Sequence, residues 1–227
     1  MSHSWGSSVW LLPTRNRPEA CQALIAAMQQ VDDVPDVAVM QDGDPYEIDW
    51  PARWKIHSSI EHLEFQRAIN RLFHLYPDEK TYGLITDHAR PRSKWSKVLE
   101  ETAGDWKIAY CKDNHERFNP ITGNQRIPAA SCMGGNLVRE LGYVWPDFCT
   151  HMYGDDALEE IGNELGIITI CETSLVDDLL SKKGEFPLDE NNKRLWRGKP
   201  YVKSDGIAYM DWSLNEKPLL LERFRDL

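Results

Sequence analysis

The sequence predicts an α/β fold in which helices flank a mixed, mostly parallel sheet. Short apolar runs alternate with amphipathic stretches, and no internal repeat or low-complexity segment breaks that order. The chain has 227 residues, of which 41% are hydrophobic and 27% charged, and this composition is typical of a soluble globular protein with one sizeable core. Open sheets of this kind bind ligands beyond the carboxyl ends of their strands, so the loops that follow strands are the places to look for chemistry.

The first half of the chain predicts strands with helices between them. Strands are expected at residues 9–12, 37–40, 82–85 and 106–111. A first helix begins at Pro18, which suits an opening helical turn. A long second helix runs from about Ser59 until Pro77 stops it, and a third covers residues 95–102 and ends at Gly104.

Beyond residue 112 the pattern is less regular. Residues 114–126 are polar and rich in turn formers, so they form either a lid or a surface loop. After them the order is a segment at 128–133, a helix at 135–141, a loop at 142–154, a helix at 155–165 and a strand at 167–171. The tail from Lys182 is expected to be a loop region followed by a terminal docking helix. We expect residues 1–227 to form one domain, with residues 175–227 as a candidate C-terminal extension.

Charge and cysteine usage exclude several classes of protein. The net charge of -10 disfavours general binding to nucleic acids or anionic membranes. The five cysteines are odd in number, widely spaced and without a CxxC pair, which favours buried, reduced thiols over a disulfide framework or zinc cage. The sequence has neither a run of about 20 apolar residues nor a signal-peptide pattern. We therefore expect a soluble protein in a reducing, cytoplasmic compartment.

Two polar groups follow the first two predicted strands. Thr14, Arg15 and Arg17 lie in the loop between Pro13 and the first helix, where a hydroxyl and two guanidiniums can hold a nucleotide base and a phosphate. The alternative is a helix cap with solvated arginines. Asp42 ends the second strand and could bind a base or a ribose, although Asp-Gly-Asp-Pro is also an ordinary turn.

Two acidic groups come later in the chain. Asp87 follows the strand at 82–85, where a carboxylate could bind a divalent cation, and His88 could be a second ligand for manganese or simply a solvated side chain. Asp155 and Asp156 precede a helix; one of them could be a general base, or the pair could only stabilise the helix dipole.

The order of these motifs resembles that of the GT-A glycosyltransferases. The sequence Pro-Thr-Arg-Asn-Arg-Pro after the first strand, one aspartate after the second, a single strand-end aspartate and Tyr-Gly-Asp-Asp before a helix carry the likeness. It is closest to family two and to the short phage and prophage members, and the run of residues 133–166 is its most specific part. The resemblance implies a Rossmann-like GT-A fold and a metal-assisted, inverting transfer of a hexosyl or pentosyl group from a nucleoside-diphosphate sugar to an acceptor hydroxyl.

The resemblance also implies a role for each site residue. Four residues would border the nucleotide, namely Pro13, Thr14, Arg15 and Arg17, and Asp42 would contact its base. Asp87 would bind Mn²⁺ or Mg²⁺, with His88 or His151 completing the site. Asp156 would be the base and Asp155 its supporting neighbour. The chain departs from the family in having one acid in the metal motif, and in having no histidine in the Cys-Glu-Thr-Ser segment after the last strand.

Other functions and several acceptors remain open at the level of sequence. A nucleotidyltransferase is one alternative, but no glycine-rich loop follows the first strand; a non-catalytic nucleotide- or carbohydrate-binding module is another. The acceptor could be a saccharide, a protein or a modified DNA base. The cluster of Arg90, Arg92, Lys94 and Lys97 could hold DNA or be a solvated helix face. Trp145 and the aromatic residues of the tail could stack on an acceptor or belong to the core.

Overall fold

The central feature of the computed structural model is an eight-stranded sheet with the order β3-β2-β1-β4-β7-β6-β8-β5. The structure describes residues 7–112, 130–179 and 200–225, so the polar segment 114–126 and the start of the tail lie outside the described residues. The strands are β1 (Ser8–Thr14), β2 (Val37–Asp42), β3 (Lys55–Ser59), β4 (Thr81–Ile85), β5 (Ala89–Pro91), β6 (Ile108–Lys112), β7 (Ala130–Gly134) and β8 (Ile168–Asp178).

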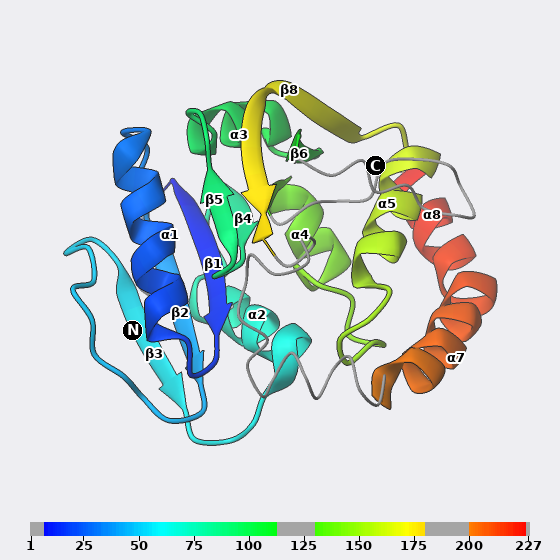
Figure 1. Ribbon diagram of the computed structural model, residues 1–227. Coiled ribbons are helices and arrows are strands. Elements are labelled where there is room, and N and C mark those ends of the chain that lie inside the picture. Colours follow the sequence, from blue (N-terminus) through cyan, green and yellow to red (C-terminus); the bar gives the residue numbers. More distant parts are fainter. Residues whose placement is uncertain (1–6, 113–129, 180–199, 226–227) are drawn as a thin grey trace.

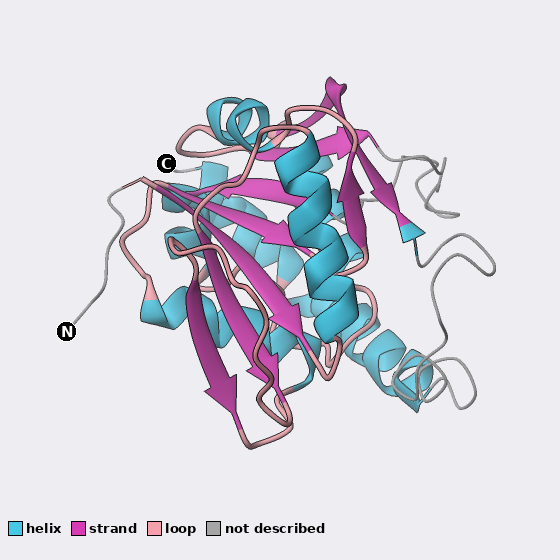
Figure 2. Cartoon of the chain, turned by 60° about the vertical axis from the view of Figure 1, so that its left-hand side comes forward, coloured by secondary structure: helices cyan, strands magenta, loops and turns pink. Residues whose placement is uncertain are grey.

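Helices cover both faces of this twisted sheet (Figures 1 and 2). They are α1 (Pro18–Gln30), α2 (Glu64–Leu75), α3 (Ser96–Ala103), α4 (Gly135–Leu141), α5 (Gly154–Glu164), α7 (Pro200–Asn215) and α8 (Lys217–Arg225). The α7–α8 pair lies outside the sheet and packs along α5 (Figure 1). This arrangement confirms the expected α/β class with a mixed sheet flanked by helices.

The protein has two hydrophobic cores, one on each face of the sheet, and β1 contributes side chains to both. Trp10 and Leu12 point to one side and pack with residues of α1 and α3, whereas Val9 and Leu11 point to the other side and pack with residues of α2, α4 and α5. Successive side chains of a strand point to opposite faces, so a strand that is covered on both sides must be apolar throughout. This is why β1 reads as a continuous apolar run.

Strand direction brings the functional loops to one edge. β1 is parallel to β2 and β4, and β2 is parallel to β3. β7 is antiparallel to both β4 and β6, so β6 runs in the same direction as β4, and β8 is parallel to β6. The carboxyl ends of β1, β2, β4, β6 and β8 therefore lie at a single edge, which we call the carboxyl edge.

Several predicted boundaries were wrong for identifiable reasons. The helix expected from Ser59 begins at Glu64, because Ser59 ends the strand β3, a polar and mostly exposed strand with no apolar pattern. The three-residue strand β5 is too short to show a pattern. The strand expected at 167–171 continues to Asp178. The tail ends in two helices, α7 and α8, where one was expected.

The cysteine prediction is confirmed. All five cysteines are free and buried. Burial raises the pKa of the Cys21 thiol to about 12, and a nearby carboxylate, Asp87, adds to this effect. Within the described residues, no helix combines the length and the apolar character needed to cross a membrane.

Gly83 tests the packing at the centre of the sheet. A Cβ at this position would lie 2.2 Å from a ring carbon of Trp10, which is fully buried. We expect Gly83→Ala to lower the free energy of unfolding by about 1–3 kcal/mol, because the indole cannot move without disturbing the core. Urea denaturation measures this change.

The matched control is Gly206→Ala in α7, where a new Cβ would lie 3.4 Å from the Tyr153 hydroxyl oxygen, an ordinary contact. Alanine should stabilise this helix by about 0.5–1 kcal/mol. Equal effects at the two positions would contradict the packing described around Trp10.

Candidate active site

The loops predicted to carry chemistry meet at the carboxyl edge. β1 ends at Thr14, β2 ends at Asp42, and Asp87 follows β4 by two residues. Pro13 lies within β1 beside Met40 of β2. Topology alone thus brings the nucleotide-loop and metal-motif candidates to the same side of the sheet.

Thr14 and Arg17 bind the Asp87 carboxylate directly. The Thr14 hydroxyl donates to Asp87 Oδ2 at 3.0 Å, and Arg17 Nη1 donates to Asp87 Oδ1 at 3.2 Å. Only 3% of Asp87 is exposed. Because a buried charge is tolerated only when it is paired and hydrogen-bonded, this contact fixes the loop after β1 against the end of β4.

The environment keeps Asp87 ionised. Burial by itself would raise the pKa of Asp87, but the hydrogen bond from His88 and the charge of Arg17 outweigh it and hold the pKa below its ordinary value. The carboxylate is therefore negatively charged at neutral pH.

His88 lies between two buried carboxylates. Its Nδ1 is 3.4 Å from Asp87 Oδ1, and its Nε2 is 3.4 Å from Asp178 Oδ1. Asp178 ends β8 and was not among the residues predicted from the sequence. A register shift of β8 opposite Cys111 and Lys112 lets the strand continue to this position, and the acid pair after Leu175 and Val176 was the signal that could have identified it.

Tyr46 and Cys21 are further members of this group that sequence reasoning missed. The Tyr46 hydroxyl is 3.0 Å from Thr14 Oγ1 and 3.2 Å from Cys21 Sγ, and the Cys21 thiol donates to Thr14 at 3.3 Å. The Tyr46 ring lies 5.9 Å from that of Trp50, which in turn lies 5.9 Å from that of Trp54. The segment between β2 and β3 thus braces the Thr14 side chain through an aromatic series.

The two arginines of the loop between β1 and α1 contact different side chains. Arg17 binds Asp87, whereas the Arg15 guanidinium contacts the imidazole of His62. His62 Nδ1 is 3.0 Å from Asp42 Oδ2, and Asp42 Oδ1 accepts the Leu63 backbone N–H at 2.7 Å. Asp42 therefore holds the segment that leads into α2.

The acidic pair lies in the first turn of α5. Asp156 is buried and Asp155 is half-buried. Tyr153 immediately precedes the helix with φ of 66°, a left-handed conformation that is rare for a tyrosine, and a Cβ on Gly154 would lie 2.1 Å from Trp145 Nε1. α5 turns directly into β8 and runs back along it, so its first turn lies toward the carboxyl edge (Figure 1).

The C-terminal helix α7 secures the turn before the acidic pair. Asp205, of which 2% is exposed, accepts the backbone N–H groups of His151 and Met152 with its Oδ2, both at 2.8 Å. The ring of Tyr209 stacks on that of Tyr153 with centroids 5.3 Å apart. The last described helices thus help to set the position of α5.

The candidate metal ligands come from two places in the fold, the segment after β4 and the turn before α5. The ring of His151 packs edge-on to that of Phe65, with centroids 5.8 Å apart. Among the residues that the structure describes, no group of three or more His, Cys, Asp or Glu side chains could hold a metal ion. Asp87 and His88 are adjacent, whereas His151 belongs to the turn that α7 holds, and the pairing of Asp87 with either histidine at a metal stays a proposal.

The basic residues near Asp87 also have partners within the chain. Arg90 donates to the backbone oxygens of Asp87 and Ala89, and Arg92 Nε lies 2.6 Å from Asp177. Lys94 is exposed and lies 3.4 Å from Asp32.

Trp145 is buried in the core, which agrees with the second of its two interpretations from sequence.

Comparisons with known proteins relate this chain to solved glycosyltransferase structures. No family model and no curated protein matches the sequence. The fold is similar to that of GalNAc-T7 crystallised with UDP, GalNAc and Mn²⁺ (TM-score 0.57, 10% identity) and to that of the mannosyltransferase PcManGT of Pyrobaculum calidifontis with GDP-Man and Mn²⁺ (TM-score 0.58, 10% identity). It is also similar to that of glucosyl-3-phosphoglycerate synthase of Mycobacterium tuberculosis with Mn²⁺, UDP and phosphoglyceric acid (TM-score 0.54, 14% identity).

Coverage limits this likeness to the fold. The matches cover 76%, 89% and 89% of this chain, but 43%, 64% and 79% of the respective neighbours. The chain thus spans less than two thirds of the first two neighbours. Its architecture is the GT-A glycosyltransferase fold; at these identities the comparison carries no residue roles.

Asp205 offers a test of the link between α7 and the turn before α5. We expect Asp205→Ala to lower the free energy of unfolding by about 2–3 kcal/mol, because two backbone donors lose a charged acceptor. Asp205→Asn keeps an oxygen and should lose less. Denaturation gives the global effect, and amide hydrogen exchange of residues 150–156 gives the local one.

The control is Asp211→Ala, which removes an exposed carboxylate bonded to Asn215 of the same helix. It should change stability by less than about 0.5 kcal/mol. Unchanged exchange of residues 150–156 in Asp205→Ala would refute the anchoring role.

Proposed function

We propose that the protein transfers a glycosyl group from a nucleoside-diphosphate sugar to an acceptor hydroxyl. The observation that carries the proposal is the ionised, buried Asp87, which binds both Thr14 and Arg17 at the carboxyl edge of a GT-A fold. This contact joins the loop expected to border the nucleotide to the motif expected near the diphosphate. The likeness to enzymes crystallised with UDP or GDP-Man supports a donor of that class.

The donor would lie along the loop between β1 and α1. Pro13 and Thr14 would border the nucleotide, and Arg15 and Arg17 would face its diphosphate, since guanidiniums bind phosphate oxygens with two hydrogen bonds. Asp42 would accept a hydrogen bond from the base. Its Oδ1 already accepts the Leu63 N–H, so the base would use Oδ2, beside His62.

The residues around Asp87 fit a divalent cation that binds together with the diphosphate. Asp87 Oδ2 accepts the Thr14 hydroxyl, whereas Oδ1 accepts Arg17 Nη1 and lies 3.4 Å from His88 Nδ1, so the second lone pair of Oδ2 could bind a cation. Magnesium at nucleotide sites commonly uses one or two carboxylates and completes its shell with water and substrate phosphates. His88 would add a nitrogen ligand acceptable to manganese. A bound Mn²⁺ or Mg²⁺ would neutralise charge on the departing diphosphate.

Asp156 would act as the general base and Asp155 as its supporting neighbour. The acceptor oxygen attacks the anomeric carbon while its proton passes to Asp156; the bond from that carbon to the diphosphate breaks, and its electron pair leaves with the nucleoside diphosphate. Arg15 and Arg17 would stabilise the developing negative charge. Attack opposite the leaving group inverts the anomeric centre. The closeness to phage-type members of family two is part of this proposal and depends on residues 133–166.

A panel of sugar nucleotides tests donor binding. We expect at least one UDP-, GDP- or dTDP-sugar to raise the melting temperature in the presence of Mn²⁺, because a ligand at a hundred times its Kd stabilises the fold by about 2.7 kcal/mol. Thermal shift with Mn²⁺, Mg²⁺ or EDTA measures the effect and its metal dependence. A shift with nucleoside triphosphates alone would favour nucleotidyl transfer, and no shift with any donor would contradict the proposal.

Asp156→Asn separates chemistry from binding. We expect the rate of nucleoside diphosphate release to fall by about 10²–10⁴-fold, as when a general base is removed, while the donor-induced thermal shift remains. Glu101→Gln, an exposed change in α3, is the control and should keep full activity. Retained activity in Asp156→Asn would mean that another group takes the proton, or that the measured turnover does not belong to this site.

A further inference from the structure

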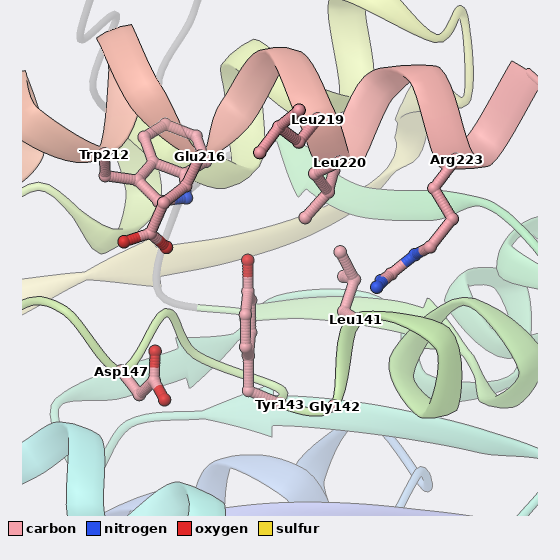
Figure 3. A pocket seen from close by; sticks show the side chains of 9 residues that line it. All are labelled: Leu141, Gly142, Tyr143, Asp147, Trp212, Glu216, Leu219, Leu220 and Arg223. Carbon is pink, nitrogen blue, oxygen red and sulfur yellow. The ribbon is translucent and has the colours of Figure 1, made fainter.

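A pocket of about 610 Å³ separates the loop after α4 from the C-terminal helices (Figure 3). Its floor comes from the end of α4 and the residues after it, and its opposite wall comes from α7 and α8. This volume is within the range of small-molecule sites, which is about 300–1,000 Å³, and is too small to enclose a folded partner. The lining residues are Leu141, Gly142, Tyr143, Asp147, Trp212, Glu216, Leu219, Leu220 and Arg223.

The lining combines apolar walls with hydrogen-bond acceptors at the rim. Leucine side chains from α4 and α8 face each other, while the exposed carboxylates of Asp147 and Glu216 lie on one side (Figure 3). The Arg223 Nε is 2.8 Å from Glu140 Oε1, so its charge is already paired. With two carboxylates and one paired cation, the pocket disfavours phosphates and other anions.

Tyr143 supplies the polar group inside the pocket. Its hydroxyl points between Leu220 and the Trp212–Glu216 side of the wall (Figure 3). The oxygen is buried and has no hydrogen-bond partner among the described residues. Burial raises the pKa of Tyr143, and the nearby charges of Asp147 and Glu216 raise it further, so the hydroxyl keeps its proton and is available as a donor. Leaving such a group unpaired costs about 1–3 kcal/mol, which a polar ligand would recover.

The pocket and the acidic pair share their supports. The loop between α4 and α5 lines the pocket at Tyr143 and Asp147 and reaches the first turn of α5 at its other end. α7 likewise lines the pocket with Trp212 and holds the turn before α5 with Asp205. A ligand in the pocket would therefore contact the same two segments that set the position of Asp156.

We propose that this pocket binds a saccharide unit of the acceptor. Vicinal hydroxyls both donate and accept, so a sugar could donate to Asp147 and Glu216 and accept from Tyr143, while its apolar C–H face packs on the leucines. Neither a phosphate nor a purely apolar ligand satisfies this set of groups. The assignment of this saccharide as the acceptor rests on the proposed function. The binding of a saccharide in this pocket does not depend on catalysis.

The test measures saccharide binding in the absence of a donor. Methyl glycosides of glucose, galactose, mannose and N-acetylglucosamine, and the β-1,4-linked disaccharides of glucose and N-acetylglucosamine, are titrated by ligand-observed NMR against the full chain and its variants. We expect one of them to bind, and Tyr143→Phe and Glu216→Ala each to weaken that binding by about tenfold, the effect of losing one hydrogen bond of about 1.4 kcal/mol. Glu222→Ala, on α8 but outside the lining, should leave binding unchanged.

The melting temperature of Tyr143→Phe shows whether weaker saccharide binding reflects a lost contact or partial unfolding. Removing an unpaired buried hydroxyl should leave the melting temperature of Tyr143→Phe equal to or above that of the parent chain, so weaker binding cannot be attributed to unfolding. Absence of saccharide binding, unchanged binding in both lining variants, or binding of spermine in place of any sugar would each overturn the proposal.

The donor panel separates this proposal from the proposed function. If sugar nucleotides stabilise the chain but no saccharide binds, the pocket assignment fails and glycosyl transfer stands. If a saccharide binds with the expected variant effects while no donor does, the pocket is a carbohydrate site of a protein that is not a glycosyltransferase.

Discussion

The antiparallel strand β7 is the constraint on which the candidate site depends. It lies between β4 and β6 and pairs with both, so the two parallel parts of the sheet point in the same direction. Because β7 is antiparallel to each of them, β6 runs in the same direction as β4, and the carboxyl ends of β6 and β8 share an edge with those of β1, β2 and β4. Through this one strand, Asp178 of β8 comes within reach of His88, 3.4 Å away, although 90 positions separate the two residues in the sequence.

The strands that sequence analysis could predict are those that carry a run of apolar residues, whereas β7, which is buried but built of small residues, was not identified as a strand. Each of β1, β2, β4 and β6 contains an apolar run, and the rule that parallel strands present their carboxyl ends together was enough to group Thr14, Arg17 and Asp87. The edge strands β3 and β5 carry no such pattern, because polar or very short strands need no apolar residues. Asp205 could not be assigned, since its partners lie about 50 residues away in the chain and no local pattern indicates where a terminal helix docks.

The acidic composition has a structural use that net charge conceals. Asp33 accepts the backbone N–H groups of Trp95 and Ser96, Asp42 accepts that of Leu63, and Asp205 accepts those of His151 and Met152. Carboxylates bonded to backbone donors fix loops without needing a partner side chain. Part of the negative charge therefore has a structural role in positioning the loops, and the arrangement of the few arginines at the carboxyl edge bears more directly on substrate preference than the net charge does.

The register shift in β8 allows this strand to pair first with β6 and then with β5. Residues 168–171 pair with β6 and residues 176–178 pair with β5, whereas Glu172 and Thr173 between them are exposed. The segment between the two paired parts acts as a linker within the strand. Its length can change during evolution without shifting the register of either paired part. Related chains could thus gain or lose residues here while the residue paired with Ala89 stays beside His88, because neither paired part has to move.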